Sequence, residues 1–301
     1  MDTQLTMNDE HWLLAVDGGG SHCRVRLCDS NHNVLSEASA GSANVRLGAD
    51  TVFKEILSAT AQALKQANLT QDILKKTYVG MGLAGAVSPS LNDSIRKHPH
   101  PFAALHLEND AVIACLGAHQ AQPGAIVILG TGSCAIINHG DKVQQQFQTI
   151  GGWGLGISDQ GSGAKLGLDF VRAALTGFEG ITQNSPLIDT FMQTFNDSPL
   201  AVFQWCEQAK PKQYGSLVPM IIEHHQQNDP IACQLINNSI NEATALIART
   251  IELSATKVCL MGGYAQFIAP LLDNELKQHI CSAQGDALDG GIYLAKYSYL
   301  Q

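Results

Sequence analysis

Two aspartates follow runs of mainly apolar residues that predict strands. Leu13–Val16 precedes Asp17, and Ala104–Leu107 comes shortly before Asp110. Asp17 leads into Gly18-Gly19-Gly20-Ser21-His22, and glycines let a chain turn sharply with its N–H groups uncovered. Bare amides, a hydroxyl and a carboxylate can cradle a phosphate and its metal ion. The alternative is an ordinary glycine hairpin in which Asp17 is a turn residue.

Asp110 opens a predicted helix and follows Glu108 and Asn109. One interpretation is a helix N-cap, a common role for Asp and Asn. The other is a general base that takes a proton from a substrate hydroxyl. A single carboxylate does not decide between them, so the neighbours of Asp110 in space must.

A loop rich in glycine carries one indole. Trp153 lies within Gly151-Gly152-Trp153-Gly154-Leu155-Gly156, and Asp159 follows closely. A core indole is one interpretation. The other is a sugar site, where the ring covers an apolar sugar face and a carboxylate accepts hydrogen bonds from hydroxyls.

Two further glycine turns follow buried strands: Gly130-Thr131-Gly132-Ser133 after Ala125–Leu129, and Gly262-Gly263 after Lys257–Met261. No G-x-x-x-x-G-K-[ST] motif occurs, which excludes a P-loop. Three glycine turns at strand ends therefore indicate a nucleotide held between two domains by backbone amides.

The segment Gly80-Met81-Gly82-Leu83-Ala84-Gly85 matches the G-x-G-x-x-G fingerprint of dinucleotide sites. That fingerprint opens a long helix, whereas Ser88-Pro89 follow here at once. A closely packed strand end is the better interpretation, and a dehydrogenase would rest on this motif alone.

Strand and helix patterns alternate along the chain, which predicts an α/β architecture. Each half opens with strand, glycine turn and strand. Helices are expected from Asp50 or Thr51 to about Asn68, from Asp159 to about Leu175, and around Leu271–Leu276. The region 186–254 looks all-helical, and we place the domain boundary near Pro123.

The net charge of −9, without a basic block, argues against nucleic acid or anionic membranes as partners. The polar start Met1–Glu10 predicts no signal peptide, and no apolar run is long enough for a membrane span. The eight cysteines form no C-x-x-C pair and lie mostly in apolar stretches. This favours reduced thiols in a cytoplasmic protein over a zinc or iron–sulfur site.

From about Leu13 to Ala295, these motifs in this order resemble the actin/hexokinase/heat-shock-ATPase superfamily. Within it, the chain is similar to the N-acetylglucosamine and glucosamine kinases, which are related to the BadF-type ATPases. The resemblance implies two ribonuclease-H-like domains, about 1–119 and 120–286, with a cleft between them. It also implies that the last helix, about 287–301, returns to the first domain and that 186–254 is a helical insertion.

The resemblance also implies roles for the site residues, with ATP and Mg²⁺ as cofactors. Asp17 would help to hold hydrated Mg²⁺, the residues after it would form the first phosphate loop, and Asp110 would be the base for a sugar 6-hydroxyl. The remaining expected positions are the second phosphate loop Gly130, Thr131, Gly132 and Ser133, the adenosine turn Gly262 and Gly263, and the sugar contacts Asn44, Asn109, Asp110, Gly152, Trp153 and Asp159. Many relatives have Glu where Gln160 stands, so the polar lining of the sugar site is open.

The function implied is phosphorylation of an amino sugar, glucosamine ahead of N-acetylglucosamine, with other hexoses as further alternatives. A second class on the same fold is the ATPase that activates 2-hydroxyacyl-CoA dehydratases, which needs a cluster-binding cysteine pair; the scattered cysteines argue against it. A sugar-sensing repressor would need an N-terminal DNA-binding helix pair, for which the start at Trp12 leaves no room. The sequence leaves the oligomeric state open, although kinases of this group are often homodimers.

Overall fold

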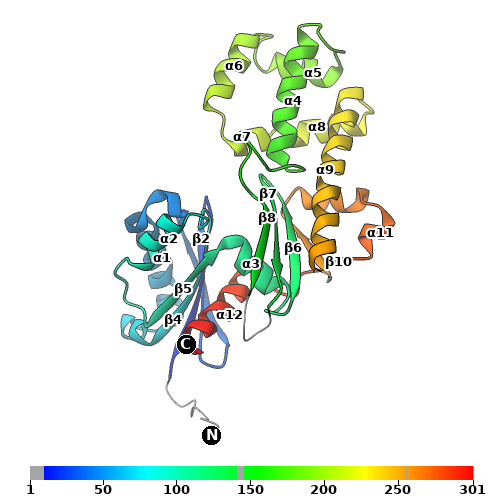
Figure 1. The fold of residues 1–301 in the computed structure, drawn as a ribbon. Coiled ribbons are helices and arrows are strands. Elements are labelled where there is room, and N and C mark those ends of the chain that lie inside the picture. Colours follow the sequence, from blue (N-terminus) through cyan, green and yellow to red (C-terminus); the bar gives the residue numbers. More distant parts are fainter. Residues whose placement is uncertain (1–9, 141–145, 255–256, 301) are drawn as a thin grey trace. The chain divides into compact units, whose positions relative to one another are not determined.

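The computed structural model describes residues 10–140, 146–254 and 257–300. The chain divides into two compact units (Figure 1). Unit 1 comprises Met1–Pro123, Gly140–Gln146 and Ala283–Gln301, and unit 2 comprises Gly124–His139 and Phe147–Ser282. Within the described ranges, no helix has both the length and the apolar character needed to cross a membrane.

Unit 1 is built on a five-stranded mixed sheet, here called sheet A. Its strands are β1 (Trp12–Gly18), β2 (Cys23–Cys28), β3 (Val34–Ala40), β4 (Thr77–Leu83) and β5 (Ala104–Asn109). They lie in the order β3-β2-β1-β4-β5. The first three strands pair antiparallel, whereas β4 and β5 are parallel to β1. Antiparallel neighbours need only a hairpin, while parallel neighbours need a longer crossover.

Helices cover both faces of sheet A. Alternate residues of a strand point to opposite faces, and β1 shows this directly: Leu14 and Val16 belong to the core that includes helix α1, whereas Leu13 and Ala15 pack with helix α12. The helical segments of unit 1 are η1 (Val45–Leu47), α1 (Ala49–Gln66), η2 (Gln71–Lys76), α2 (Pro89–Arg96), α3 (Asp110–Ala118) and α12 (Ala287–Leu300). The final helix thus completes the core of the unit in which the chain begins (Figure 1).

Unit 2 has the same strand topology as unit 1 in its own five-stranded sheet, here called sheet B. Its strands are β6 (Gly124–Leu129), β7 (Ser133–Asn138), β8 (Phe147–Gly151), β9 (Val258–Met261) and β10 (Ile280–Cys281). The order is β10-β9-β6-β7-β8, with β6, β7 and β8 antiparallel and β9 and β10 parallel to β6. The predicted α/β class, with two similar halves, is therefore confirmed.

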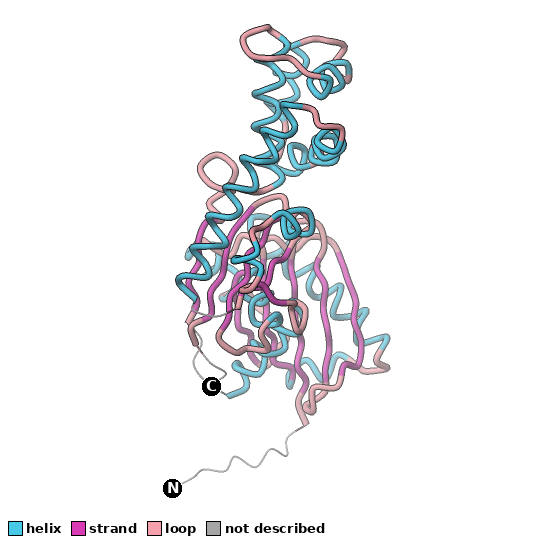
Figure 2. Tube along the Cα trace, turned by 90° about the vertical axis from the view of Figure 1, so that its right-hand side faces the viewer, coloured by secondary structure: helices cyan, strands magenta, loops and turns pink. Residues whose placement is uncertain are grey.

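Most helices of unit 2 lie between β8 and β9 in the chain. They are α4 (Gly163–Phe178), α5 (Pro186–Gln193), α6 (Pro199–Gln208), α7 (Pro211–Gly215), α8 (Val218–Gln226) and α9 (Pro230–Ser254), and β9 is followed by α10 (Ala265–Ile268), η3 (Ala269–Leu271) and α11 (Asn274–Lys277). Figures 1 and 2 show α4–α8 gathered at one end of the unit, with α9 running from them to sheet B. The expected helical region 186–254 is thus observed.

Three helix predictions were wrong in detail. Helix α1 begins after Gly48, whose φ of 87° no other residue adopts easily, and not at a cap formed by Asp50 or Thr51. Helix α4 begins after Ser162, because Asp159 and Gly161 have φ values of 66° and 71° that end any helix there. The residues after β9 form three short segments instead of one helix, since Pro270 lacks the N–H that a continuous helix requires.

Two of the three glycines of the G-x-G-x-x-G match, Gly80 and Gly82, lie inside β4 and allow close packing. A β-carbon at Gly80 would collide with the backbone of Gly291 and Ala295 in α12, and one at Gly82 would collide with Ile113 in α3. Glycine therefore lets two helices approach sheet A closely. The structure supports the interpretation as a closely packed strand.

Candidate active site

In unit 1, the carboxyl ends of three parallel strands lie in one row. Gly18 of β1 is in register with Leu83 of β4, which is in register with Asn109 of β5. The glycine turn after Asp17 and the carboxylate of Asp110 therefore belong to the same edge of sheet A. In open α/β sheets, ligands bind outside the carboxyl ends of the strands.

Asp17 is held by its partner across the hairpin. It lies opposite Arg24 in the β1–β2 register, and Arg24 donates to Asp17 Oδ2 from Nη2 at 2.6 Å and from Nε at 3.2 Å. Both bonds use the same oxygen, so Oδ1 has no protein donor among the residues that the structure describes. A fixed carboxylate with one oxygen available fits the expected Mg²⁺ ligand or water acceptor, since Mg²⁺ prefers oxygen ligands.

The turn that follows Asp17 is closed by its own backbone. The N–H of Gly19 donates to the carbonyl of His22 at 2.9 Å, and Ser42 Oγ donates to the carbonyl of Gly19 at 3.0 Å. In the described chain, the amides of Gly20 and Ser21 have no protein acceptor. These two N–H groups are the best candidates for a phosphate contact in the predicted loop of Gly18, Gly19, Gly20, Ser21 and His22.

Asp110 is the first residue of α3, and its N-cap is Asn109. Asn109 Oδ1 and Asp110 Oδ1 both accept from the N–H of Ala111, at 2.9 and 3.0 Å. The N-cap interpretation thus belongs to Asn109, and Asp110 Oδ2 has no donor among the described residues. Burial raises the pKa of Asp110, the Ala111 hydrogen bond opposes this, and the charge of Asp17 raises it further.

Asn44 lies beside the first glycine turn. Its Oδ1 accepts from the N–H of Arg46 at 2.9 Å and caps η1, while the N–H of Val45 donates to the carbonyl of Ala84, just beyond β4. The predicted sugar contact is therefore fixed in place through its oxygen, which leaves its amide N–H groups to donate to a ligand.

In unit 2, the glycine turn between β6 and β7 is braced by the start of α4. The N–H groups of Gly163 and Ala164 donate to the carbonyls of Gly130 and Thr131 at 2.8 and 3.1 Å, and Ser133 Oγ donates to the carbonyl of Gln160 at 2.7 Å. The amides of Thr131 and Gly132 have no protein acceptor in the described residues. The predicted second phosphate loop, with Gly130 and Ser133 at its ends, is thus rigid with two amides available.

Asp159 joins the indole loop to this turn. Its carboxylate accepts from the N–H of Ser133 at 3.4 Å, and its pKa is raised by burial and lowered in part by hydrogen bonds from the Ser133 and Gly154 backbones. Only 6% of the residue is exposed. The structure therefore shows Asp159 bonded to backbone amides, in addition to any part in sugar binding.

Trp153 is 68% exposed, so the core interpretation of this indole is wrong. It lies between Gly152 and Gly154, whose φ values of 76° and 95° suit glycine. Ile157 in the same loop is 81% exposed. Unit 2 thus presents two large apolar side chains on a loop that Asp159 anchors, a surface that can cover the face of a sugar.

A pocket of about 450 Å³ in unit 2 adjoins the predicted second phosphate loop. Its lining is mainly apolar: Gly130, Thr131, Gly163, Lys212, Gly215, Ser216, Val218, Pro219, Ile222, Gly263, Tyr264 and Phe267. The sequence predicted Gly130, Thr131 and Gly263 as nucleotide contacts, but not the residues from α7 and α8. The short helices α7 and α8 carry no sequence motif for nucleotide binding. Only their position in the fold, beside Gly263, identifies their residues as part of the pocket. Gly262, with φ 95°, lets the chain pass close to the carbonyl of Leu129.

Comparisons with known proteins agree with this picture. The chain is 35% identical over 285 residues to the glucosamine kinase GspK of Vibrio cholerae, covering 95% of this chain and 96% of that protein. It is 25% identical to the N-acetylmuramic acid/N-acetylglucosamine kinase of Clostridium acetobutylicum, covering 95% and 98% of the two chains.

Among solved structures, one from Chromobacterium violaceum with the provisional name N-acetylglucosamine kinase superposes with a TM-score of 0.83 at 29% identity, covering 95% of this chain and 99% of that chain. A glucokinase of the ROK family from Streptomyces griseus, solved with glucose and AMPPNP, shares the fold with a TM-score of 0.52 at 18% identity, covering 96% and 100%. The predicted actin/hexokinase-like fold is thus confirmed. The model of the BadF/BadG/BcrA/BcrD ATPase family matches residues 14–287, and this chain belongs to that family.

Proposed function

We propose that this chain is an ATP-dependent kinase that transfers a phosphoryl group to the 6-hydroxyl of an amino sugar, with glucosamine as its substrate. The observation that carries the proposal is the row formed by the Asp17 turn, the end of β4 and Asp110 at one edge of sheet A. The overall similarity to a glucosamine kinase, at 35% identity over 95% of this chain, supports the substrate.

Phosphoryl transfer needs alignment, charge neutralisation and exclusion of water more than covalent chemistry by the protein. Asp110 accepts the proton of the 6-hydroxyl through Oδ2, the oxygen without a protein donor. Its pKa, raised by burial, makes it a better proton acceptor than an exposed aspartate. The available oxygen and the raised pKa of Asp110 both support its proposed role as the base.

The residues fit ATP and Mg²⁺ as cofactors. The apolar pocket beside Gly263 suits a purine base, and the amides of Gly20, Ser21, Thr131 and Gly132 suit phosphate oxygens. Asp17, oriented by Arg24, would hold Mg²⁺ or its water ligands. When bound, Mg²⁺ supplies positive charge that stabilises the phosphate oxygens during transfer.

Sugar recognition is assigned to Asn44, Asn109, Gly152, Trp153 and Asp159. Trp153 covers the apolar face of the ring, since its indole is exposed on an anchored loop. Asn44 and Asn109 use their oxygens as caps, so they contribute amide N–H groups to the sugar hydroxyls.

We also propose that units 1 and 2 are the two domains that the family resemblance implies. A cytoplasmic location accords with ATP as substrate and with eight cysteines, all among the described residues, that form no disulfide. The homodimer stays a prediction, which the molar mass in solution would test.

The test is an ADP-release assay with Mg-ATP and, in separate reactions, glucosamine, N-acetylglucosamine, glucose and no sugar. Turnover with glucosamine well above the other arms supports the proposal. A preference for N-acetylglucosamine would overturn the substrate while keeping the kinase. Equal ADP release without sugar would overturn the kinase and favour an ATPase that drives a partner protein.

Trp153→Ala tests the sugar platform. Because the indole is exposed, we expect the variant to fold normally and to show a KM for the sugar raised about tenfold, with the KM for ATP unchanged. Phe203→Ala, at an exposed aromatic residue of α6 outside the proposed site, is the matched control. An unchanged sugar KM in Trp153→Ala would remove this residue from the sugar site.

A further inference from the structure

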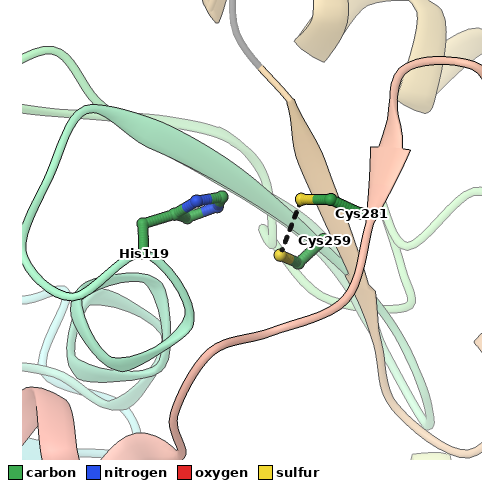
Figure 3. A group of neighbouring side chains, drawn as sticks. All are labelled: His119, Cys259 and Cys281. Atoms are coloured by element: carbon green, nitrogen blue, oxygen red, sulfur yellow. Dashed lines mark hydrogen bonds between the residues drawn. The ribbon is translucent and has the colours of Figure 1, made fainter.

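Two cysteines lie side by side at one edge of sheet B. Cys259 in β9 and Cys281 in β10 are in register on neighbouring parallel strands, and their Sγ atoms are 3.3 Å apart (Figure 3). They are 22 positions apart in the sequence, so only the fold brings them together. No part of the proposed kinase reaction uses either thiol.

The spacing of the two residues suits a disulfide. Neighbouring strands are separated by about 4.8 Å, and disulfides form across Cα separations of about 4.4–6.8 Å. The sulfurs need to approach by only about 1.2 Å to reach the bond length of about 2.05 Å. A tetrahedral metal ion would instead hold two sulfurs about 3.8 Å apart, so the observed 3.3 Å favours the disulfide over a metal site.

The two thiols differ in access. Cys259 is 1% exposed, whereas Cys281 is only partly buried. A reagent from solution therefore reaches Cys281 first. The buried thiol of Cys259 is in contact with the thiol of Cys281. A reachable thiol beside a second, resolving thiol is the usual arrangement of a redox-sensitive pair.

We propose that Cys259 and Cys281 form a reversible disulfide, with a small-molecule disulfide such as oxidised glutathione as the oxidant. The Cys281 thiolate attacks one sulfur of the oxidant, and a mixed disulfide forms as one molecule of small thiol leaves. The Cys259 thiolate then attacks Cys281 Sγ and releases the second small thiol. The protein gives up two electrons and two protons, and the oxidant is reduced to two thiols.

The bond would fix the end of unit 2. Strand β10 has only two residues and lies at the edge of sheet B, and the chain leaves unit 2 after Ser282. Strand β9 leads directly into Gly262 and Gly263, the second of which lines the proposed nucleotide pocket. A link between the strands therefore stabilises the sheet edge from which that turn begins, and we expect the thermal unfolding midpoint to rise on oxidation.

The test equilibrates the full chain in glutathione buffers of increasing oxidised fraction. Remaining thiols are alkylated and the protein is digested without reduction for mass spectrometry. We expect a peptide pair linked through Cys259 and Cys281 as the main oxidised product, at a yield independent of protein concentration and reversed by excess dithiothreitol. Glutathione adducts without this link, links between chains, or no oxidation would each overturn the proposal.

Variants sharpen the result. Cys281→Ser should abolish the linked peptide and the rise in unfolding midpoint. Cys233→Ser is the matched control, because Cys233 is also a partly buried cysteine of unit 2 but lies on α9. This variant should retain the linked peptide and the rise in unfolding midpoint. The mapping of the unmodified chain needs no variant, so the proposal stays testable if Cys281→Ser does not fold.

Discussion

Sheets A and B share one topology, yet their loops carry different chemistry. In each, three antiparallel strands are followed by two strands parallel to the first. In unit 1, the carboxyl edge of the sheet carries two carboxylates, Asp17 and Asp110, each with an oxygen that has no donor among the described residues. In unit 2, the corresponding region carries rigid glycine turns and an apolar pocket.

The aspartates of the two units show this difference most clearly. Burial raises the pKa of both Asp110 and Asp159. Asp110 accepts backbone hydrogen bonds only from the start of its own helix, whereas Asp159 accepts from the backbones of Ser133 and Gly154 and joins two loops. The same topology thus holds one aspartate within the start of a single helix, the proposed base Asp110, and another that bonds to the backbones of two loops.

The largest effect should come from Asp110→Asn. Asparagine keeps the hydrogen bond from Ala111 but cannot accept a proton, and loss of a general base costs about 10²–10⁴-fold in turnover. We expect kcat to fall by this factor while ATP binding, measured by calorimetry, is unchanged. Asp93→Asn, at an exposed carboxylate of α2 that pairs with Lys97, is the control and should keep full activity. Near-full activity of Asp110→Asn would refute the role of Asp110.

The second largest effect should be the loss of stability when a side chain is added at Gly80, where α12 packs closely on sheet A. In Gly80→Ala, the added methyl group meets the backbone of Gly291 and Ala295 in α12, which cannot move aside as a flexible side chain can. Overpacking of this kind costs about 1–3 kcal/mol, so the midpoint of urea unfolding should fall clearly. Gly156→Ala, where an added β-carbon meets nothing within 4 Å, should leave it unchanged. A normal unfolding midpoint for Gly80→Ala would contradict the packing role of this glycine.

The apolar pocket of unit 2 can be narrowed without disturbing the fold. Gly263 lines it, and a β-carbon there would meet no atom within 4 Å. We expect Gly263→Val to raise the KM for ATP about tenfold, equivalent to about 1.4 kcal/mol, with the KM for the sugar unchanged. If both constants stayed at their original values, the pocket would not be the adenosine site.

Much of this organisation follows from local sequence patterns. Apolar runs such as Leu13–Val16 predict buried strands, and glycine turns at their ends predict the exposed amides, because both signals depend on a few adjacent residues. The dual topology also follows, since each half begins with the same hairpin pattern. The two-residue strand β10 and the short strand β8 were not predicted, because segments this short do not show a periodic pattern of apolar residues.

Features that depend on packing between distant segments could not be predicted. The pocket lining from α7 and α8, the hydrogen bond from Ser133 to Asp159 and the pairing of Cys259 with Cys281 each join residues that are far apart in the chain. Asp159 illustrates the limit well. Its residue type and position predicted a sugar contact, but only the fold shows that its carboxylate binds backbone amides.

The smallest expected effect concerns stability and again separates the two aspartates. A carboxyl group whose pKa is higher in the folded than in the unfolded chain binds more protons when folded, so stability falls as pH rises through that interval. Burial raises the pKa of Asp110, so this penalty is present at pH values above its folded-state pKa. Asp110→Asn removes the buried charge, and we expect its thermal unfolding midpoint at pH 7 to rise slightly even though activity is lost.

The same shift places the acid limb of the activity profile above the ordinary aspartate pKa of about 3.9, since the base must be ionised to act. Asp159→Asn is the informative comparison, because asparagine has one acceptor oxygen instead of two for the backbone N–H groups of Ser133 and Gly154. That variant should therefore unfold at a lower temperature, although burial raises the pKa of Asp159 as it raises that of Asp110. Equal stability changes in the two variants would show that Asp159 does not anchor the loop.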